Sequence, residues 1–197
     1  METHGNGKNE LLIQVDEQDR VIGSVDRQRA HLGQGILHRG LMVVVRNAEN
    51  KILLTQRAMA RPDLGFPPPF PGFWDVTIAG HPKWGQTDYV TQMVNELKEE
   101  LGIEAKETEV KFLGKFQYHA PDPTYPNLET ASTFRLSERE ICGVGVLHTN
   151  NNPVLDAVEL QACIWMGSKV FIDKLKSLKM APWASLMLEK FPQVVKT

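Results

Sequence analysis

The sequence predicts an α/β sandwich in which a mixed sheet is covered by helices on both faces. Two observations predict it. Short apolar segments typical of strands recur along the chain between polar turns, and two or three stretches have the apolar spacing of amphipathic helices. The 197 residues, 42% of them hydrophobic, suffice for one domain with a substantial core. We therefore expect a single domain over residues 10–197, preceded by a disordered polar tail over residues 1–9.

The elements are expected in the following order. Strands are predicted at 11–15, 40–45 and 51–56, in a Trp-containing segment just before Gly80, and at 109–118, 133–146 and 162–165. Turns are predicted at 16–19, 47–50 and 120–123. Helices are predicted at 90–101, ended by Gly102, and at 168–178 and 181–191. The Pro-rich segment 62–71 is a surface loop or the rim of an apolar pocket, and the polar insertion between Tyr118 and Glu138 is a lid or a longer hairpin.

Three glutamates in the first predicted helix carry the strongest chemical signal. Glu96, Glu99 and Glu100 are i, i+3 and i+4, so their carboxylates share one helix face, beside an apolar arc. Like charges this close weaken a helix unless a cation lies between them. Clustered carboxylate oxygens suit Mg²⁺ or Mn²⁺, which most often serve phosphate groups. The alternative is a solvated helix face, but the Gly-His-Pro loop before the helix and Gly102 after it favour the metal site.

This segment resembles the core of the Nudix box, G-x5-E-x7-R-E-U-x-E-E-x-G-U, with U an aliphatic residue. The matching residues are Glu96, Leu97, Glu99, Glu100, Gly102 and Ile103. Three positions depart from the pattern: His81 stands at the first glycine, Thr87 at the early glutamate and Asn95 at the arginine. The resemblance implies a Nudix-type α/β/α sandwich, a small-molecule diphosphate substrate, and Mg²⁺ or Mn²⁺ bound by Glu96, Glu99 and Glu100.

The segment Gly80-His81-Pro82 resembles the type I isopentenyl-diphosphate isomerase branch of this superfamily, and further matches follow in order over roughly residues 10 to 190. They imply a divalent-metal site, suited to Zn²⁺ or Mn²⁺, formed by His31, His38, His81, Glu138 and Glu140. They also imply substrate binding by Arg27, Arg57, Arg61 and Trp183, and catalysis by Tyr118 and Glu140. The two arginines of 57–61 are otherwise surface charges, and Trp183 is otherwise a core residue.

One position departs from the isomerases in a way that affects the chemistry. They have a cysteine acid/base just before the Gly-His pair, where this chain has Ala79, and a methyl group cannot transfer a proton. Cys142 would lie on the same strand face as Glu138 and Glu140 and not opposite them. Because the glutamate triplet is complete, the first hypothesis is hydrolysis of a small, isoprenoid-type diphosphate, with Glu99 and Glu100 catalytic. The alternatives are an isomerase with altered acid/base residues and a non-catalytic diphosphate-binding protein.

Composition excludes several other classes. A net charge of −2 and a pI near 6.3 give no electrostatic basis for binding nucleic acid or an anionic membrane. Cys142 and Cys163 lack metal-ligand spacing and fit a reducing, cytoplasmic compartment. The N-terminus has no apolar segment typical of a secretory signal, and no stretch is apolar for long enough to predict a membrane span. A monomer or a homodimer is expected.

Overall fold

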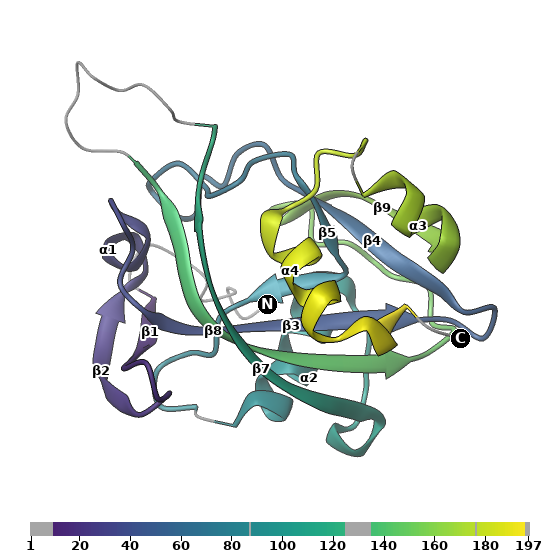
Figure 1. Cartoon of the computed structure of the whole chain (residues 1–197), viewed down its shortest axis with the longest axis horizontal. Helices are drawn as coiled ribbons and strands as arrows, with labels where there is room; N and C mark the ends of the chain where they lie inside the picture. Colours follow the sequence, from purple (N-terminus) through teal and green to yellow (C-terminus); the bar gives the residue numbers. More distant parts are fainter. Residues whose placement is uncertain (1–9, 87, 125–134, 176, 196–197) are drawn as a thin grey trace.

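A computed structural model describes residues 10–86, 88–124, 135–175 and 177–195 (Figure 1). The expected tail over residues 1–9 lies outside the described residues, as do Thr87 and residues 125–134 of the insertion expected between Tyr118 and Glu138. The structure therefore does not test these expectations.

Nine strands of the described residues join in one mixed sheet, in which β3 and β8 are parallel and the other named pairs are antiparallel. The strands are β1 (Leu11–Val15), β2 (Val21–Asp26), β3 (His38–Arg46), β4 (Lys51–Arg57), β5 (Trp74–Val76), β6 (Ile78–Gly80), β7 (Val110–Pro121), β8 (Ser137–His148) and β9 (Leu160–Gly167). Strand β3 is central, because it pairs with β1, β4, β6 and β8.

The helices of the described residues are α1 (Arg27–His31), α2 (Tyr89–Leu101), α3 (Ser168–Lys174) and α4 (Pro182–Lys190), with 3-10 turns η1 (Glu107–Glu109) and η2 (Pro192–Val194). Helix α2 has the caps that its sequence predicts. The Asp88 carboxylate accepts the Thr91 N–H at 2.8 Å, and Gly102 ends the helix in the left-handed conformation, with φ 60°.

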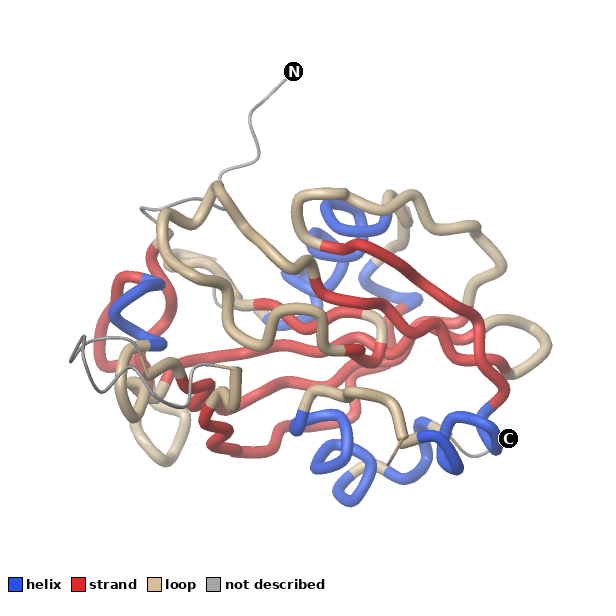
Figure 2. The backbone as a smooth tube through the Cα atoms, turned by 90° about the horizontal axis from the view of Figure 1, so that it is seen from above, coloured by secondary structure: helices blue, strands red, loops and turns tan. Residues whose placement is uncertain are grey.

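Alternate residues of β3 face two separate cores. Met42 and Val44 point to one face, where they pack with α3 and α4, and Leu41, Val43 and Val45 point to the other, where they pack with α2. Figure 2 shows helices on both sides of the red strands. The predicted α/β fold with a mixed sheet is therefore confirmed. The single-domain boundary at residue 10 stays a prediction.

Four details of the predicted elements were wrong. The helix expected over 168–178 ends at Lys174, because the segment after it pairs with Trp74, whose N–H donates to the Lys179 carbonyl at 2.7 Å. The turn expected at 120–123 begins later, since β8 pairs with β7 as far as Pro121. The Trp-containing strand is split into β5 and β6 at Thr77, whose φ is 58°. Strand β2 and helix α1 were not expected, because both are short, β2 is interrupted by Gly23 and Ser24, and α1 is mostly polar.

Candidate active site

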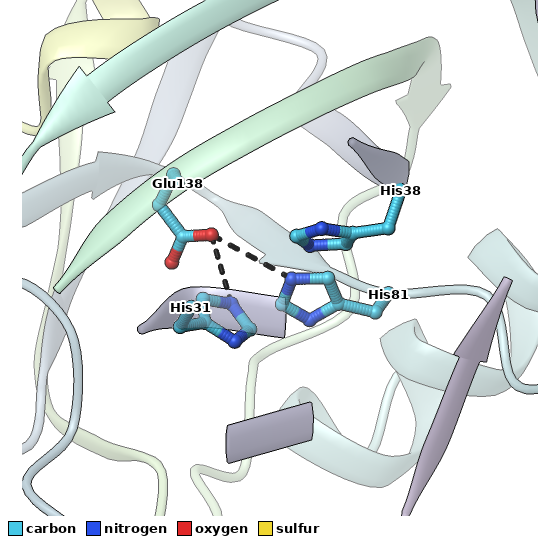
Figure 3. A group of neighbouring side chains, drawn as sticks. All are labelled: His31, His38, His81 and Glu138. Carbon is cyan, nitrogen blue, oxygen red and sulfur yellow. Dashed lines mark ion pairs between the residues drawn. The ribbon is translucent and has the colours of Figure 1, made fainter. Parts of the chain in front are cut away.

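Three histidines and a glutamate from four separate segments meet beside β3. His31 ends α1, His38 begins β3, His81 follows β6, and Glu138 lies on β8. All four are buried, and the ring centroids of each histidine pair are 5.1 Å apart. One ligating atom from each residue lies within 4.8 Å of the others (Figure 3). The sheet produces this cluster, because β6 and β8 both pair with β3.

The hydrogen bonds around the cluster direct imidazole nitrogens to its centre. The Nδ1 atoms of His31 and His38 each lie 2.6 Å from a backbone carbonyl oxygen, that of Arg27 and that of Ile36. Donation from Nδ1–H to these carbonyls leaves the Nε2 lone pairs for a ligand. Both Nε2 atoms and Oε2 of Glu138 are buried without a hydrogen-bond partner in the described structure, although His31 Nε2 lies 2.9 Å from Oε2 of Glu138. Buried polar atoms that converge in this way fit a divalent cation.

The ionisation of the cluster also suits a metal. Burial, together with the neighbouring His81 and His31, holds the pKa of His38 well below its usual value of 6.5, so that its imidazole is neutral. Burial also opposes a charge on His81, but Glu138 and Glu140 outweigh it and raise the pKa of His81 to about 9. Burial alone would raise the pKa of Glu138, yet His31 and His81 hold it well below 4.5. A carboxylate is therefore ready as a ligand, and His81 must lose a proton to become one.

Glu140 connects the cluster to a tyrosine. Its Oε1 lies 3.1 Å from Nε2 of His81, and its Oε2 accepts the Tyr118 hydroxyl at 2.9 Å. The register places Tyr118 opposite Glu140 between β7 and β8. Burial, and then Glu140, raise the pKa of Tyr118 well above 10, so its hydroxyl is a proton-bearing donor. The side chain of Glu140 occupies the space beside Gly40, where a Cβ would lie 1.7 Å from Oε2.

The glutamates of α2 lie apart from this cluster and do not all point the same way. Glu96 and Glu100 are buried, each with 4% exposure, whereas Glu99 is half-buried and paired with Lys83 at 3.0 Å. Burial, and then Glu159, raise the pKa of Glu96 to about 7 and that of Glu100 well above 4.5. A cation bound between the two carboxylates would favour their charged forms and so lower both pKa values.

A polar pocket connects the two groups. Ala79 and His81 line it together with the buried glutamates of α2, and its remaining walls come from Glu10, Arg27, Arg57, Ala58, Arg61, Leu64, Pro68, Pro69, Gly80, Glu159 and Leu160. Gly80 allows α2 to approach, since a Cβ there would lie 3.2 Å from Oε2 of Glu96. Leu64, Pro68 and Pro69 of the Pro-rich segment thus line this polar pocket, whereas an apolar tail site beside them stays a prediction.

The predicted substrate-binding residues have unequal environments. Arg61 is held by Asp63, through two hydrogen bonds of 2.9 and 2.7 Å, and by Glu159 at 2.6 Å. Arg27 forms a buried ion pair with Glu10. Trp183 is 1% exposed, packs in the core and does not line the pocket.

Three acidic residues near the pocket were missed by sequence reasoning: Glu10, Glu159 and Asp75. Glu10 and Glu159 directly precede β1 and β9, and Asp75 is a polar residue within a buried strand. A charged residue next to or inside an apolar strand was the available signal.

Comparisons with known proteins identify the family. Residues 36–191 match the model of the NUDIX domain. A Haloarcula marismortui protein named isopentenyl-diphosphate Delta-isomerase is 30% identical over 96% of this chain and 94% of its own. A Nocardia farcinica protein of the same name is 31% identical over 89% of this chain and 90% of its own. The chain belongs to the Nudix family, as its sequence motifs predicted.

Solved structures agree on the fold. A crystal structure of DR0079 from Deinococcus radiodurans matches with a TM-score of 0.64 at 19% identity, over 90% of this chain and 96% of the other. A MutT protein from Methanosarcina mazei matches with a TM-score of 0.57 at 15% identity, over 82% and 96%. Within the described ranges, no helix has the length and apolar character that crossing a membrane requires.

Proposed function

We propose that this protein is a metal-dependent Nudix enzyme that hydrolyses a small organic diphosphate. The observation that carries the proposal is the burial of Glu96 and Glu100 side by side in a pocket that also contains Arg57. Neither glutamate is ion-paired with a lysine or arginine of the described residues. Buried carboxylates without such pairing are costly, and Mg²⁺ or Mn²⁺ suits their oxygens. A diphosphate brings further oxygen ligands, and the arginine complements its charge.

The residues of the pocket would divide the work of hydrolysis. Glu96 and Glu100 would hold the metal, with Glu99 on the same helix but outside the pocket lining, and Arg57 and Arg61 would bind phosphate oxygens. When bound, the metal supplies charge neutralisation and lowers the pKa of a bound water. The water oxygen forms a new bond to phosphorus, the bridging P–O bond breaks, and a carboxylate accepts the water proton. Glu100 fits this base role better than Glu99, because Lys83 holds Glu99.

The histidine cluster would hold a second divalent ion, Zn²⁺ or Mn²⁺, through His31, His38, His81 and Glu138, with Glu140 beside it. The relatives named isopentenyl-diphosphate isomerase support an isoprenoid tail on the diphosphate. The two cysteines are free, which agrees with the proposed cytoplasmic location. We retain a monomer or homodimer.

Isomerisation of isopentenyl diphosphate is the second candidate, and the Tyr118–Glu140 hydrogen bond favours it. Moving a double bond needs one group that donates a proton and another that removes one, on the two faces of the allyl unit. Glu140 and Tyr118 can serve one face. At the other face Ala79 replaces the cysteine, and no thiol is among the described residues that line the pocket. Because a second proton-transfer group, the thiol, is missing at this face of the described pocket, we rank hydrolysis above isomerisation.

One experiment separates these functions. The protein is incubated with isopentenyl diphosphate and Mg²⁺ in D₂O and followed by phosphorus and proton NMR. Release of phosphate with an undeuterated product supports hydrolysis. Deuterated dimethylallyl diphosphate supports isomerisation and overturns the ranking. Saturable binding without either product, for this and other small diphosphates, supports a non-catalytic binding protein.

A further inference from the structure

A buried carboxylate behind the pocket ties two of its predicted parts together. Asp75, on β5, is 2% exposed. Its two oxygens accept the indole N–H of Trp183 at 3.0 and 2.9 Å, and Oδ1 also accepts the N–H of Val76 at 2.8 Å. Because Asp75 does not line the pocket, it does not touch a ligand there. Asp75 can therefore affect ligand binding only through the residues that it contacts.

Arg57 is the pocket residue that Asp75 faces. Its Nη1 lies 3.8 Å from Oδ2 of Asp75, and its guanidinium carbon lies 5.6 Å from the centre of the Trp183 ring. Its Nε donates to the Pro69 carbonyl at 3.3 Å. The guanidinium thus lies on an aromatic ring whose edge is fixed by the same carboxylate that attracts it. The Arg57 side chain keeps 19% exposure, so it is the less enclosed of the two pocket arginines of this segment.

Arg61 is held by more carboxylate contacts than Arg57. Asp63 binds Arg61 through both its oxygens, and Glu159 adds a third contact, so that the orientation of Arg61 is fixed without Asp75. Arg57 has the longer ion pair and a flexible side chain that must be ordered when it binds phosphate oxygens. Contacts with Asp75 and Trp183 would restrict the Arg57 side chain before the ligand binds.

We propose that Asp75 is a positioning residue, which holds Trp183 and faces Arg57 so that the Arg57 guanidinium is oriented for the diphosphate. This inference rests on the proposed diphosphate site. It adds a residue that acts through Arg57, and it explains why a charged side chain lies in the buried strand β5. It also assigns Trp183 an indirect part in binding, as the surface on which Arg57 lies.

The test is the affinity for inorganic pyrophosphate with Mg²⁺, measured by titration calorimetry, so that no turnover is needed. Asp75→Asn keeps an oxygen acceptor for the indole N–H and removes the charge that faces Arg57. We expect it to raise the Kd about three- to tenfold, the cost of ordering one flexible side chain. In an Arg57→Ala background the same change should alter the Kd by less than about twofold, because residues that act through one another are not additive.

Asp19→Asn is the matched control, since Asp19 is a carboxylate with 8% side-chain exposure that faces Arg39 at 2.7 Å, away from the pocket lining. It should leave the Kd unchanged. If Asp75→Asn does not fold, Trp183→Phe, which keeps an aromatic ring and removes the N–H, should show the same dependence on Arg57.

The outcomes are distinct. A Kd unaffected by Arg57→Ala contradicts the proposed phosphate site itself. If Arg57→Ala weakens binding while Asp75→Asn does not, only the positioning role is overturned. An equal effect of Asp75→Asn with and without Arg57 also overturns it, because a purely structural role would act in both backgrounds.

Discussion

His38 and Glu140 face each other across the parallel pair of β3 and β8, with Nε2 of His38 3.8 Å from Oε1 of Glu140. The two residues are far apart in the sequence, and only the strand register brings them together. The antiparallel register of β7 and β8 places Tyr118 against the same glutamate, so Glu140 connects the histidine cluster to a proton-bearing hydroxyl. The histidines and Glu140 are thus positioned by the pairing of strands in one sheet.

The histidine cluster should bind one Zn²⁺ or Mn²⁺ ion, with an affinity that depends on pH. The pKa of His81 is about 9 without metal, so at lower pH its proton must leave before it can act as a ligand. Affinity should therefore fall as the pH is lowered from 9 to 6, with proton release on binding. Calorimetry in buffers of different ionisation enthalpy measures both. His38→Gln should weaken binding at least about tenfold, and the exposed His148→Gln should not. Binding that does not change with pH would contradict the assignment of His81.

Glu96→Gln should abolish Mg²⁺-dependent hydrolysis and stabilise the metal-free protein. Burial raises the pKa of Glu96 from 4.5 to about 7, so the folded state binds more protons than the unfolded state between these pH values. The free energy of unfolding of the wild type then falls by about 3 kcal/mol as the pH rises through this window. Glutamine does not ionise, so the variant does not lose this stability. Denaturant unfolding with chelator at pH 8 and pH 4 measures the difference, which should disappear at pH 4.

The control for this prediction is Glu104→Gln, whose side chain is 78% exposed and which should change neither property. Excess Mg²⁺ should narrow the stability gap at pH 8, because only the wild type has the full set of ligands. A metal-free Glu96→Gln variant that is less stable than the wild type at pH 8 would show that Glu96 is a structural residue.

Much of the fold could be predicted from local sequence. The strands 11–15, 40–45 and 51–56 alternate or are uniformly apolar, and Gly102 marks the end of α2, so their boundaries follow from local chemistry. The short strand β2 and helix α1 could not be predicted. Gly23 and Ser24 interrupt the apolar pattern of β2, α1 is mostly polar, and both depend on pairing with β1 or packing beside it. Tertiary contacts also decide where α3 ends.

The candidate site was predicted less completely. Family motifs indicated the histidines and glutamates by residue type, and the structure brings His31, His38, His81 and Glu138 together. Helical periodicity placed Glu99 with Glu96 and Glu100, yet Glu99 pairs with Lys83 and does not line the pocket. That ion pair joins a loop to a helix, and residue spacing does not encode it. The roles of Asp75 and Glu159 could not be predicted from the sequence, because their partners lie on distant elements.

Gly40→Ala should disrupt the histidine cluster through Glu140. A Cβ at position 40 would lie 1.7 Å from Oε2 of Glu140, so the carboxylate must move and lose its hydrogen bond with Tyr118. Overpacking of this kind costs about 1–3 kcal/mol of stability. Metal affinity should also fall, as measured by calorimetry. Gly23→Ala is the matched control, because nothing lies within 4 Å of its added Cβ. Unchanged metal affinity in Gly40→Ala would place Glu140 outside the metal site.

Tyr118→Phe should separate the two candidate reactions. The variant keeps the aromatic ring, which stacks on Phe116 with centroids 5.5 Å apart, and removes the hydroxyl that donates to Glu140. Hydrolysis at the α2 glutamates should change by less than about threefold, since Tyr118 does not line that pocket. Isomerisation, if the wild type has any, should fall roughly a hundredfold, the usual effect of losing one acid/base group. Loss of hydrolysis instead would place Tyr118 in the hydrolytic site.

Ala79→Cys should increase isomerisation if the pocket is otherwise built like that of the isomerases. Ala79 lies on β6, lines the pocket and packs against the core that contains Tyr118 and Trp183. A thiol there supplies the proton-transfer group that a methyl group cannot, while hydrolysis should be little affected because it relies on α2. Deuterium incorporation into isopentenyl diphosphate in D₂O, with Mg²⁺ and Zn²⁺ present, should rise at least about tenfold. Ala79→Ser, of similar size and far weaker acidity, should not show the increase. If the cysteine variant gains nothing while its hydrolysis persists, the pocket is specialised for hydrolysis by more than the residue at position 79.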